Sequence, residues 1–206
     1  MIKKSMSKRK LQAMETKKKI FETAQHLILE HGFENVSVDS IVKAADVSKG
    51  TFYVHFESKD ALAAALIHEY TSTTDKDYKS FLTNLPDQTS VFDTLLLLAE
   101  EITEFIATNI GLENMRVLYK AHLTKTINTT PAMSYDRDLY KMFTEVLERG
   151  IRQSELREDI PVEFLSKHLI MAIRGITYEW CIRFPDFDLK KQVQDHFKIL
   201  LYGLKK

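Results

Sequence analysis

The chain has 206 residues, 29 basic and 29 acidic side chains, and 44% hydrophobic residues. This length allows one large or two small domains with a buried core, and the balanced charge excludes a uniformly basic or acidic protein. The single cysteine, Cys181, excludes an internal disulfide. No apolar run approaches the roughly 18 residues that span a membrane, and no hydrophobic signal segment is present. We therefore expect a cytoplasmic protein that makes no membrane contact.

The charges are unevenly distributed along the chain. Residues 1–59 contain 11 basic and 7 acidic side chains, whereas the remainder contains 18 and 22. Residues 1–20 alone contain eight basic groups and one acid, Glu15. A basic end on an acidic body suits a protein that contacts nucleic acid at that end. The alternative is a solvated tail, which is the usual meaning of a run of charges.

The first predicted helix contains an apolar stripe and ends at Gly32. Its stripe consists of Ile20, Ala24, Leu27 and Ile28. Residues 37–59 then predict two short helices joined by a tight turn. Ser37 and Ser48 suit the caps of these helices, and Asp46 suits the left-handed backbone of the turn. The second helix directs Phe52 and Phe56 inward and the following residues outward: Lys49, Gly50, Thr51, Tyr53 and His55.

A longer motif surrounds this pair of helices. Gly32-Phe33 marks the break after the first helix, and the run from Val47 to Tyr53 reads VSKGTFY. His55-Phe56 and Ser58-Lys59 continue the pattern. With these residues, the segment 17–66 resembles the DNA-binding domain of the tetracycline-repressor (TetR) family of bacterial transcription regulators. Asp46 departs from the family pattern, which commonly has glycine there, and we expect a small stability cost without a change of fold.

The resemblance implies an all-α fold of about nine helices. Residues 1–66 would form a basic N-terminal arm and a three-helix helix-turn-helix domain, and residues 67–206 a helical ligand-binding and dimerisation domain. The implied function is a DNA-binding transcriptional regulator without enzymatic activity, most often a repressor. Its partners would be a palindromic double-stranded DNA operator, a small-molecule effector and a second copy of the chain.

The family motif also implies roles for individual residues. Lys49 would reach base acceptors, Gly50 would allow close backbone approach, and Thr51 would contact a thymine methyl or a phosphate. Tyr53 and His55 would bind phosphates, although Tyr53 also suits a partly buried position and His55 an ordinary surface position. The full set of expected DNA-binding residues is Lys17, Lys18, Ser37, Ser48, Lys49, Gly50, Thr51, Tyr53, His55 and Lys59.

Helical spacing continues through the rest of the chain. A long helix from about 59 to 82 would connect the two domains, and a loop is expected around Pro131. The run of four leucines at 95–98 predicts a helix that other helices surround. The further predicted helices cover about 91–110, 112–126, 136–154 and 161–183, and a last helix carries a stripe from Leu189 to Leu204.

The helix at 161–183 has two apolar faces, which call for two packing partners. One face contains Leu165, Leu169 and Trp180 and suits the core of the chain. The other suits a second copy, because a palindromic site calls for a two-fold symmetric protein. The alternative is that both faces pack within one chain. The resemblance to the TetR family implies that 136–154 and 161–183 form the dimer interface, and Phe164, His168, Met171 and Gly175 are expected at the contact.

Aromatic residues with a few polar groups predict a pocket in the C-terminal half for a hydrophobic or amphipathic molecule. For each of these residues a plain core position is the competing interpretation. Glu101, Glu104 and Arg174 are possible polar contacts. The residues expected to line the pocket are Phe105, Met115, Tyr119, His122, Phe143, Tyr178 and Trp180.

Two other classes of function remain as alternatives. A helical bundle enzyme is disfavoured because no Glu precedes a His by three residues, as carboxylate-bridged metal sites require. A single cysteine gives no zinc-binding spacing, and no glycine-rich phosphate loop is present, so no cofactor is expected. A helical protein-interaction module would favour apolar residues at the positions of Lys49 and Thr51.

Overall fold

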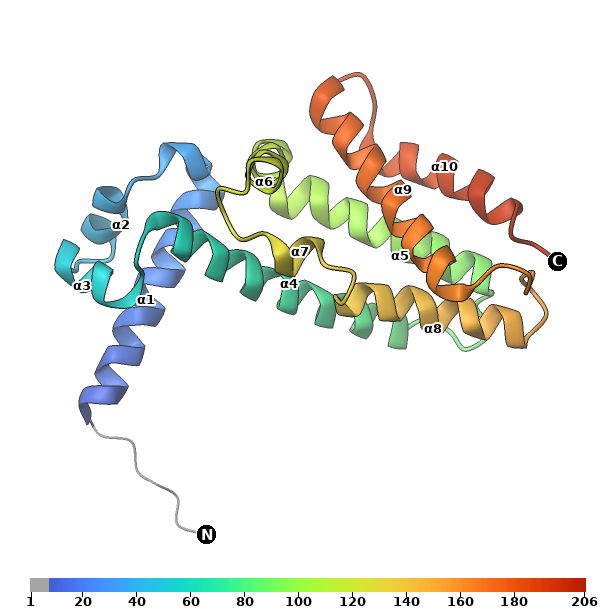
Figure 1. The fold of residues 1–206 in the computed structure, drawn as a ribbon, viewed down its shortest axis with the longest axis horizontal. Coiled ribbons are helices and arrows are strands. Elements are labelled where there is room, and N and C mark those ends of the chain that lie inside the picture. Colours follow the sequence, from blue (N-terminus) through green and yellow to red (C-terminus); the bar gives the residue numbers. More distant parts are fainter. Residues whose placement is uncertain (1–7) are drawn as a thin grey trace, which may run out of the picture.

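The computed structural model describes residues 8–206, and within this range the fold is built from helices (Figure 1). None of the helices in residues 8–206 is long and apolar enough to cross a membrane. The N-terminal unit consists of α1 (Lys8–His31), a 3₁₀ turn (Phe33–Asn35), α2 (Val38–Ala44) and α3 (Lys49–His55). The connecting helix is α4 (Lys59–Thr83), and the C-terminal body contains α5 (Val91–Phe105), α6 (Leu112–Thr124), α7 (Thr130–Met133), α8 (Asp138–Arg152), α9 (Val162–Arg183) and α10 (Leu189–Tyr202).

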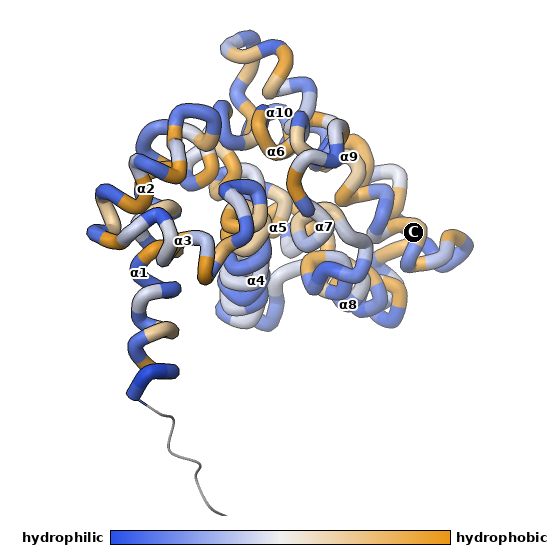
Figure 2. Tube along the Cα trace, turned by 60° about the vertical axis from the view of Figure 1, so that its left-hand side comes forward, coloured by the Kyte–Doolittle hydropathy of each residue, from blue (hydrophilic) through white to orange (hydrophobic). Residues whose placement is uncertain are grey.

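The predicted first helix is longer than expected. The apolar stripe begins at Ile20, but the helix begins at Lys8, because residues 8–19 contain no glycine or proline and consist mostly of good helix formers. Its first turns project beyond α3 and are largely hydrophilic (Figures 1 and 2). Only Ile20 and Ala24 of α1 are buried. The basic segment from Lys8 onwards is therefore a solvent-exposed helix, while the predicted contributions of residues 1–7 lie outside the described residues.

Two separate cores hold the two parts of the chain. The N-terminal core joins α1, α2 and α3 around Phe52, which is fully buried. Leu62 from the first turn of α4 completes this core. The C-terminal core joins α5, α8, α9 and α10 around residues such as Phe143 and Phe197. A smaller apolar cluster at Ala63, Ala121 and Ile127 lies between them.

Two local features differ from the expected helices. The loop around Pro131 contains a single helical turn, α7, in which proline occupies the first turn where its missing N–H is harmless. The predicted helix at 91–110 ends in a wider π-helical turn, Ile106–Ile110, and Gly111 follows with a φ of 79°. A π turn inside a helix commonly marks a functional position, and this one borders the cavity described below.

The two glycines Gly150 and Gly175 lie in very different surroundings. A Cβ atom at Gly150 would lie 2.7 Å from Leu156 Cδ1 and 2.8 Å from Val91 Cγ1, whereas a Cβ at Gly175 would meet nothing within 4 Å. We expect Gly150→Ala to lower the free energy of unfolding by about 1–3 kcal/mol through overpacking. Gly175→Ala should instead raise the helix stability by about 0.5–1 kcal/mol. Urea unfolding of both variants at low protein concentration measures this, and equal effects would contradict the packing around Gly150.

Candidate nucleic-acid interface and internal cavity

A tight turn joins α2 to α3, and side-chain caps fix both helix starts. The Ser37 hydroxyl accepts a hydrogen bond from the Ser40 N–H at 3.0 Å, and the Ser40 hydroxyl accepts one from the Ser37 N–H at 3.0 Å. Asp46 adopts the left-handed conformation predicted for the turn, with a φ of 50°. The Ser48 hydroxyl then accepts the Thr51 N–H at 3.0 Å. These caps set the angle at which α3 leaves the turn.

The short helix α3 has one buried and one exposed face. Phe52 and Phe56 are buried as predicted, and Tyr53 packs edge-to-face against Phe52 while remaining 49% exposed. Val54 is 79% exposed, although no role was predicted for it. Helical spacing could have predicted this exposure. Val54 lies four residues after Gly50, so both residues lie on the side of the helix opposite the buried phenylalanines. The exposed face of α3 thus presents Lys49, Gly50, Tyr53 and Val54.

The polar side chains at the start of α3 already have partners within the chain. Lys49 Nζ lies 2.8 Å from Asp39 Oδ1 on α2, and the hydrogen bond with this carboxylate raises the pKa of Lys49. Both side chains are more than half exposed, so the pair contributes little to stability and exchanges readily with another anion. The Thr51 hydroxyl lies 2.8 Å from the Ser48 hydroxyl. His55, at the end of α3, is half-buried.

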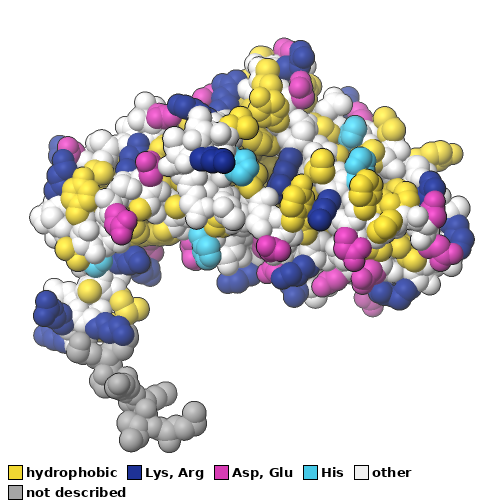
Figure 3. All heavy atoms as spheres, in the orientation of Figure 1, with side chains coloured by type: hydrophobic (Ala, Val, Ile, Leu, Met, Phe, Trp, Pro, Cys, Tyr) yellow, Lys and Arg dark blue, Asp and Glu magenta, His cyan; other side chains and the backbone are white. Residues whose placement is uncertain are grey.

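The lysines of α1 flank this surface. Lys17 Nζ lies 5.5 Å from the centroid of the Phe56 ring, which places the ammonium group beside the N-terminal core. Lys18 forms an exposed pair with Glu22 at 3.6 Å. Figure 3 shows further basic side chains along the projecting part of α1. Basic side chains of α1 therefore lie beside the N-terminal unit that carries α3.

Lys59 lies differently from the other lysines. Its ammonium group donates a hydrogen bond to the Phe33 carbonyl at 2.5 Å and lies 4.0 Å from the centroid of the Phe33 ring. Burial lowers the pKa of this group. These contacts tie the start of α4 to the break after α1, so Lys59 has a structural role in addition to the predicted phosphate contact.

An internal cavity of ≈ 230 Å³ lies between α4 and the helices of the C-terminal body. Phe105, Met115 and Tyr119 line it, as predicted. The cavity also reaches the N-terminal unit, where Gln25, Leu29 and Phe33 belong to its wall. This contribution was not foreseen, because apolar periodicity alone does not show which neighbouring unit a helix face meets.

The prediction that four other residues line this cavity is wrong. Phe143 is fully buried in the C-terminal core, and Trp180 packs edge-to-face against Phe184. His122 Nδ1 lies 2.6 Å from the Thr129 hydroxyl, outside the cavity wall. Tyr178 is 42% exposed and faces the outside beside α6. The competing interpretation of core positions was correct for Phe143 and Trp180.

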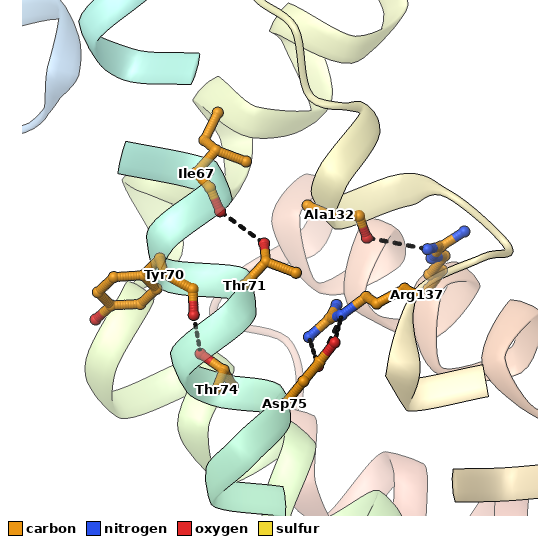
Figure 4. A network of polar contacts seen from close by, with 8 residues as sticks. Ile67, Tyr70, Thr71, Thr74, Asp75, Ala132 and Arg137 are labelled. Atoms are coloured by element: carbon orange, nitrogen blue, oxygen red, sulfur yellow. Dashed lines mark hydrogen bonds and ion pairs between the residues drawn. The ribbon is translucent and has the colours of Figure 1, made fainter. Parts of the chain in front are cut away.

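The cavity wall contains few polar groups. Arg137 forms a buried ion pair with Asp75 of α4: Nε donates at 2.8 Å to Oδ1, and Nη2 lies 2.7 Å from the same oxygen. Figure 4 shows this pair beside Thr71 and Thr74, which extend from the same side of α4. Arg174 donates from Nη2 to the Ala132 carbonyl at 3.2 Å. Asn114 contributes an Oδ1 atom that is buried and has no hydrogen-bond partner, so it is available to a donor on a bound molecule.

The second apolar face of α9 is exposed along the whole helix. Phe164 is 61% exposed, Met171 is 55% exposed and Ile182 is 57% exposed, whereas Leu165 and Leu169 on the first face are buried. The Phe164 and His168 rings stack on this surface, with centroids 6.2 Å apart. One face therefore packs in the C-terminal core, and the other meets no part of the described chain.

Helices α8 and α10 differ in the side chains that they expose. Helix α8 buries its apolar residues in the core, and its exposed residues include the charged side chains Asp138, Lys141 and Glu145. Helix α10 instead exposes Ile199 at 73% and Tyr202 at 74%. Of these three helices, α9 and α10 expose large apolar side chains and α8 does not. The expected part of α8 in the dimer interface stays a prediction.

Cys181 is buried near the C-terminal end of α9. Burial raises the pKa of its thiol to about 11. The thiol is therefore neutral at physiological pH, which suits a packed, unreactive side chain.

A compact pair of capped helices, the second with an exposed polar face and a basic flank, defines a helix-turn-helix protein of the DNA-binding class. The family described as "Bacterial regulatory proteins, tetR family" matches residues 20–66, the segment that contains these helices. Residues 20–66 therefore carry a DNA-binding domain of the TetR family, and the chain is a DNA-binding transcriptional regulator.

Relatives and solved structures extend the similarity over the whole chain. The HTH-type transcriptional regulator AcrR of Shigella flexneri is 23% identical over 201 residues, which cover 94% of this chain and 91% of that protein. A TetR-family regulator from Pectobacterium atrosepticum has a TM-score of 0.77 at 17% identity, covering 97% of this chain and 98% of its own. The Thermus thermophilus repressor FadR, solved with lauroyl-CoA, has a TM-score of 0.68 at 21% identity, covering 91% of this chain and 94% of its own.

Proposed function

We propose that this regulator binds a near-palindromic DNA operator as a symmetric homodimer and acts as a repressor. The observation that carries the proposal is the exposed face of α3, which presents Lys49, Gly50, Tyr53 and Val54 beside the basic helix α1. A helix of this kind enters the major groove, while the lysines of α1 neutralise phosphates of the backbone. Val54 adds an apolar contact suited to a thymine methyl group.

Each of the predicted DNA-binding residues retains a role in this proposal. Lys49 is the base-reading side chain, because its pair with Asp39 is exposed and weak. Tyr53 and His55 bind phosphates with Lys17 and Lys18. Ser37, Ser48 and Thr51 act mainly through the caps that orient α2 and α3, and Lys59 acts through its contact with Phe33.

The test of DNA binding is a footprint over the DNA that flanks the gene, followed by affinity measurements at several salt concentrations. We expect a protected near-palindrome and a log–log salt slope of about −0.9 for each phosphate neutralised. Lys49→Ala should reduce discrimination between the operator and a variant base pair by about 1–3 kcal/mol. Lys76→Ala, at an exposed position of α4, is the matched control and should change neither quantity. Salt-independent affinity without any protected site would reject the proposal.

The exposed apolar face of α9 and α10 is the proposed dimer interface. Phe164, His168, Met171 and Gly175 lie on the α9 part of this surface. Two recognition helices on one face of the operator must lie about 34–36 Å apart, which is one turn of DNA. A two-fold axis through this interface gives the dimer the same symmetry as a palindromic operator.

We further propose that residues 1–66 and 67–206 act as two domains. Leu62 belongs to the N-terminal core and Tyr78 to the C-terminal core, so the boundary falls within α4. An exposed salt bridge of 2.9 Å between Glu34 and Lys120 joins the domains, and so does the apolar cluster of Ala63, Ala121 and Ile127.

Control of DNA binding follows from the cavity between these domains. A molecule bound there contacts α4, α6 and α9 together with Leu29 and Phe33 of the DNA-binding unit. A change in this wall therefore alters the tilt of the N-terminal domain directly, with α4 as the connecting element. Such coupling is typically about 1–3 kcal/mol and must be reciprocal, so DNA should weaken ligand binding by the same factor.

A further inference from the structure

The cavity is long and narrow. The residues of α4 that line it recur along one side of the helix from Ala63 to Tyr78, and the 15 steps between these two residues rise about 22 Å at roughly 1.5 Å each. The volume over that length is only ≈ 230 Å³, below the roughly 300–1,000 Å³ common for ligand pockets. A space of this shape suits one unbranched chain better than a fused ring system.

The charged residues in the cavity wall have one sign. Among the described residues, Arg137 and Arg174 line the cavity, and no Asp or Glu does. Asp75 lies behind the wall and neutralises Arg137 through their buried ion pair. Arg174 has no carboxylate within 4.0 Å in the described part of the chain, so the wall carries one positive charge without an acidic partner. Arg174 is half-buried, and its guanidinium lies 5.6 Å from the centroid of the Tyr140 ring. A guanidinium that lines an apolar cavity without an acidic partner favours a bound anion.

The arginines lie at one end of the cavity. Arg137 binds Asp75, one turn before Tyr78, and Arg174 binds Ala132 in the neighbouring helix α7. Phe33 packs at the other end, beside Ala63. An anion held by the arginines therefore directs an attached apolar chain along α4 towards the DNA-binding unit.

We propose that the effector is an unbranched amphipathic molecule with a single acidic headgroup, of the class of free medium- or long-chain fatty acids. The headgroup binds Arg174, and the chain lies along α4 and ends near Phe33. This inference rests on the proposed function and adds the chemical class of the effector. A free acid presents a carboxylate to Arg174, whereas the thioester of an acyl-CoA presents none at that position, and this difference separates the two classes of effector.

The first experiment compares four probes with the same chain on the full-length protein: laurate, 1-dodecanol, dodecylamine and lauroyl-CoA, each below its micelle concentration. Calorimetry measures binding, and fluorescence anisotropy measures release of the footprinted operator. We expect laurate to bind at least about tenfold more tightly than the alcohol, because a charge-assisted hydrogen bond replaces a neutral one. The amine should bind more weakly still, and laurate should release the operator.

The second experiment changes the proposed anchor. Arg174→Gln should weaken laurate binding at least about tenfold and leave dodecanol binding unchanged, and Arg174→Lys should retain a preference for the acid. Arg183→Gln on the same helix is the matched control, because Arg183 is exposed and paired with Glu179. If Arg174→Gln does not fold, laurate and dodecanol are compared on the unmodified chain and on Arg174→Lys. These two comparisons then decide whether Arg174 binds the acidic headgroup.

Equal affinity for laurate and dodecanol would overturn the proposal. An equal loss of affinity for laurate and for dodecanol in Arg174→Gln would also overturn it. Binding of lauroyl-CoA without binding of laurate would also overturn it, because the anion would then be recognised outside the cavity. Operator binding without ligand is measured in the same samples. Its absence would reject the proposed function, whereas intact operator binding without selectivity for the acid would reject only this inference.

Discussion

Replacing Met171 with glutamate is expected to convert the dimer into a monomer and to weaken operator binding by at least about a hundredfold. Met171 lies in the middle of the exposed α9 face. In a symmetric dimer both new carboxylates would be buried without a partner, which costs about 3–5 kcal/mol. The stability of a single chain should change little, because Met171 is already half exposed there. Light scattering and operator titration of the same samples measure the two effects.

Two further substitutions identify the helix that pairs with α9. Ile199→Glu on α10 should also produce monomers, whereas Glu145→Lys on α8 should leave the dimer intact. Gly175→Leu should weaken association by about 1–3 kcal/mol, since the added side chain meets nothing within one chain and would overpack only an interface. A stable wild-type monomer at micromolar concentration, or monomers only from the α8 variant, would refute this interface.

The ion pair between Arg137 and Asp75 should produce the largest single effect on stability. Their side chains are 15% and 7% exposed. Arg137→Met removes one partner and leaves a buried carboxylate, which should lower the free energy of unfolding by about 3–5 kcal/mol. The double variant Arg137→Met with Asp75→Leu removes both charges and should recover most of this loss. Urea unfolding of the two single variants and the double variant provides the complete cycle.

Arg183→Met is the control for this cycle. It breaks an ion pair with Glu179 in which both side chains are at least half exposed, so the expected loss is below about 1 kcal/mol. Additive losses in the Arg137 and Asp75 variants would show that the two groups do not interact. A small loss in Arg137→Met would show that water reaches Asp75.

The DNA-binding unit was predictable because its signals are local. Ser37, Ser48 and Ser58 each cap the helix that follows, and the hydroxyl of each accepts a backbone N–H three residues later. Asp46 takes the predicted left-handed conformation, and Phe52 and Phe56 are buried as their spacing indicated. Caps, turns and helical spacing depend on residues within a few positions of one another, so one segment contains the whole signal.

The cavity was predictable only in part, because its wall comes from distant segments. Phe105, Met115 and Tyr119 line it, but Trp180 lies in the core. The ion pair between Asp75 and Arg137 joins residues 62 positions apart. No local pattern distinguishes an aromatic residue that borders an empty space from one that fills it, since both occupy an apolar helix face.

By itself, the sequence determined that the protein is all-helical, that residues 37–59 form two capped helices with an exposed polar face, and that α9 has two apolar faces. Only the tertiary structure decided that α10 exposes Ile199 and Tyr202 while α8 buries its apolar residues, and that Arg174 lines a cavity which reaches Phe33. The physical reason is that helical periodicity shows which residues avoid water, but contacts between distant segments decide which partner covers them.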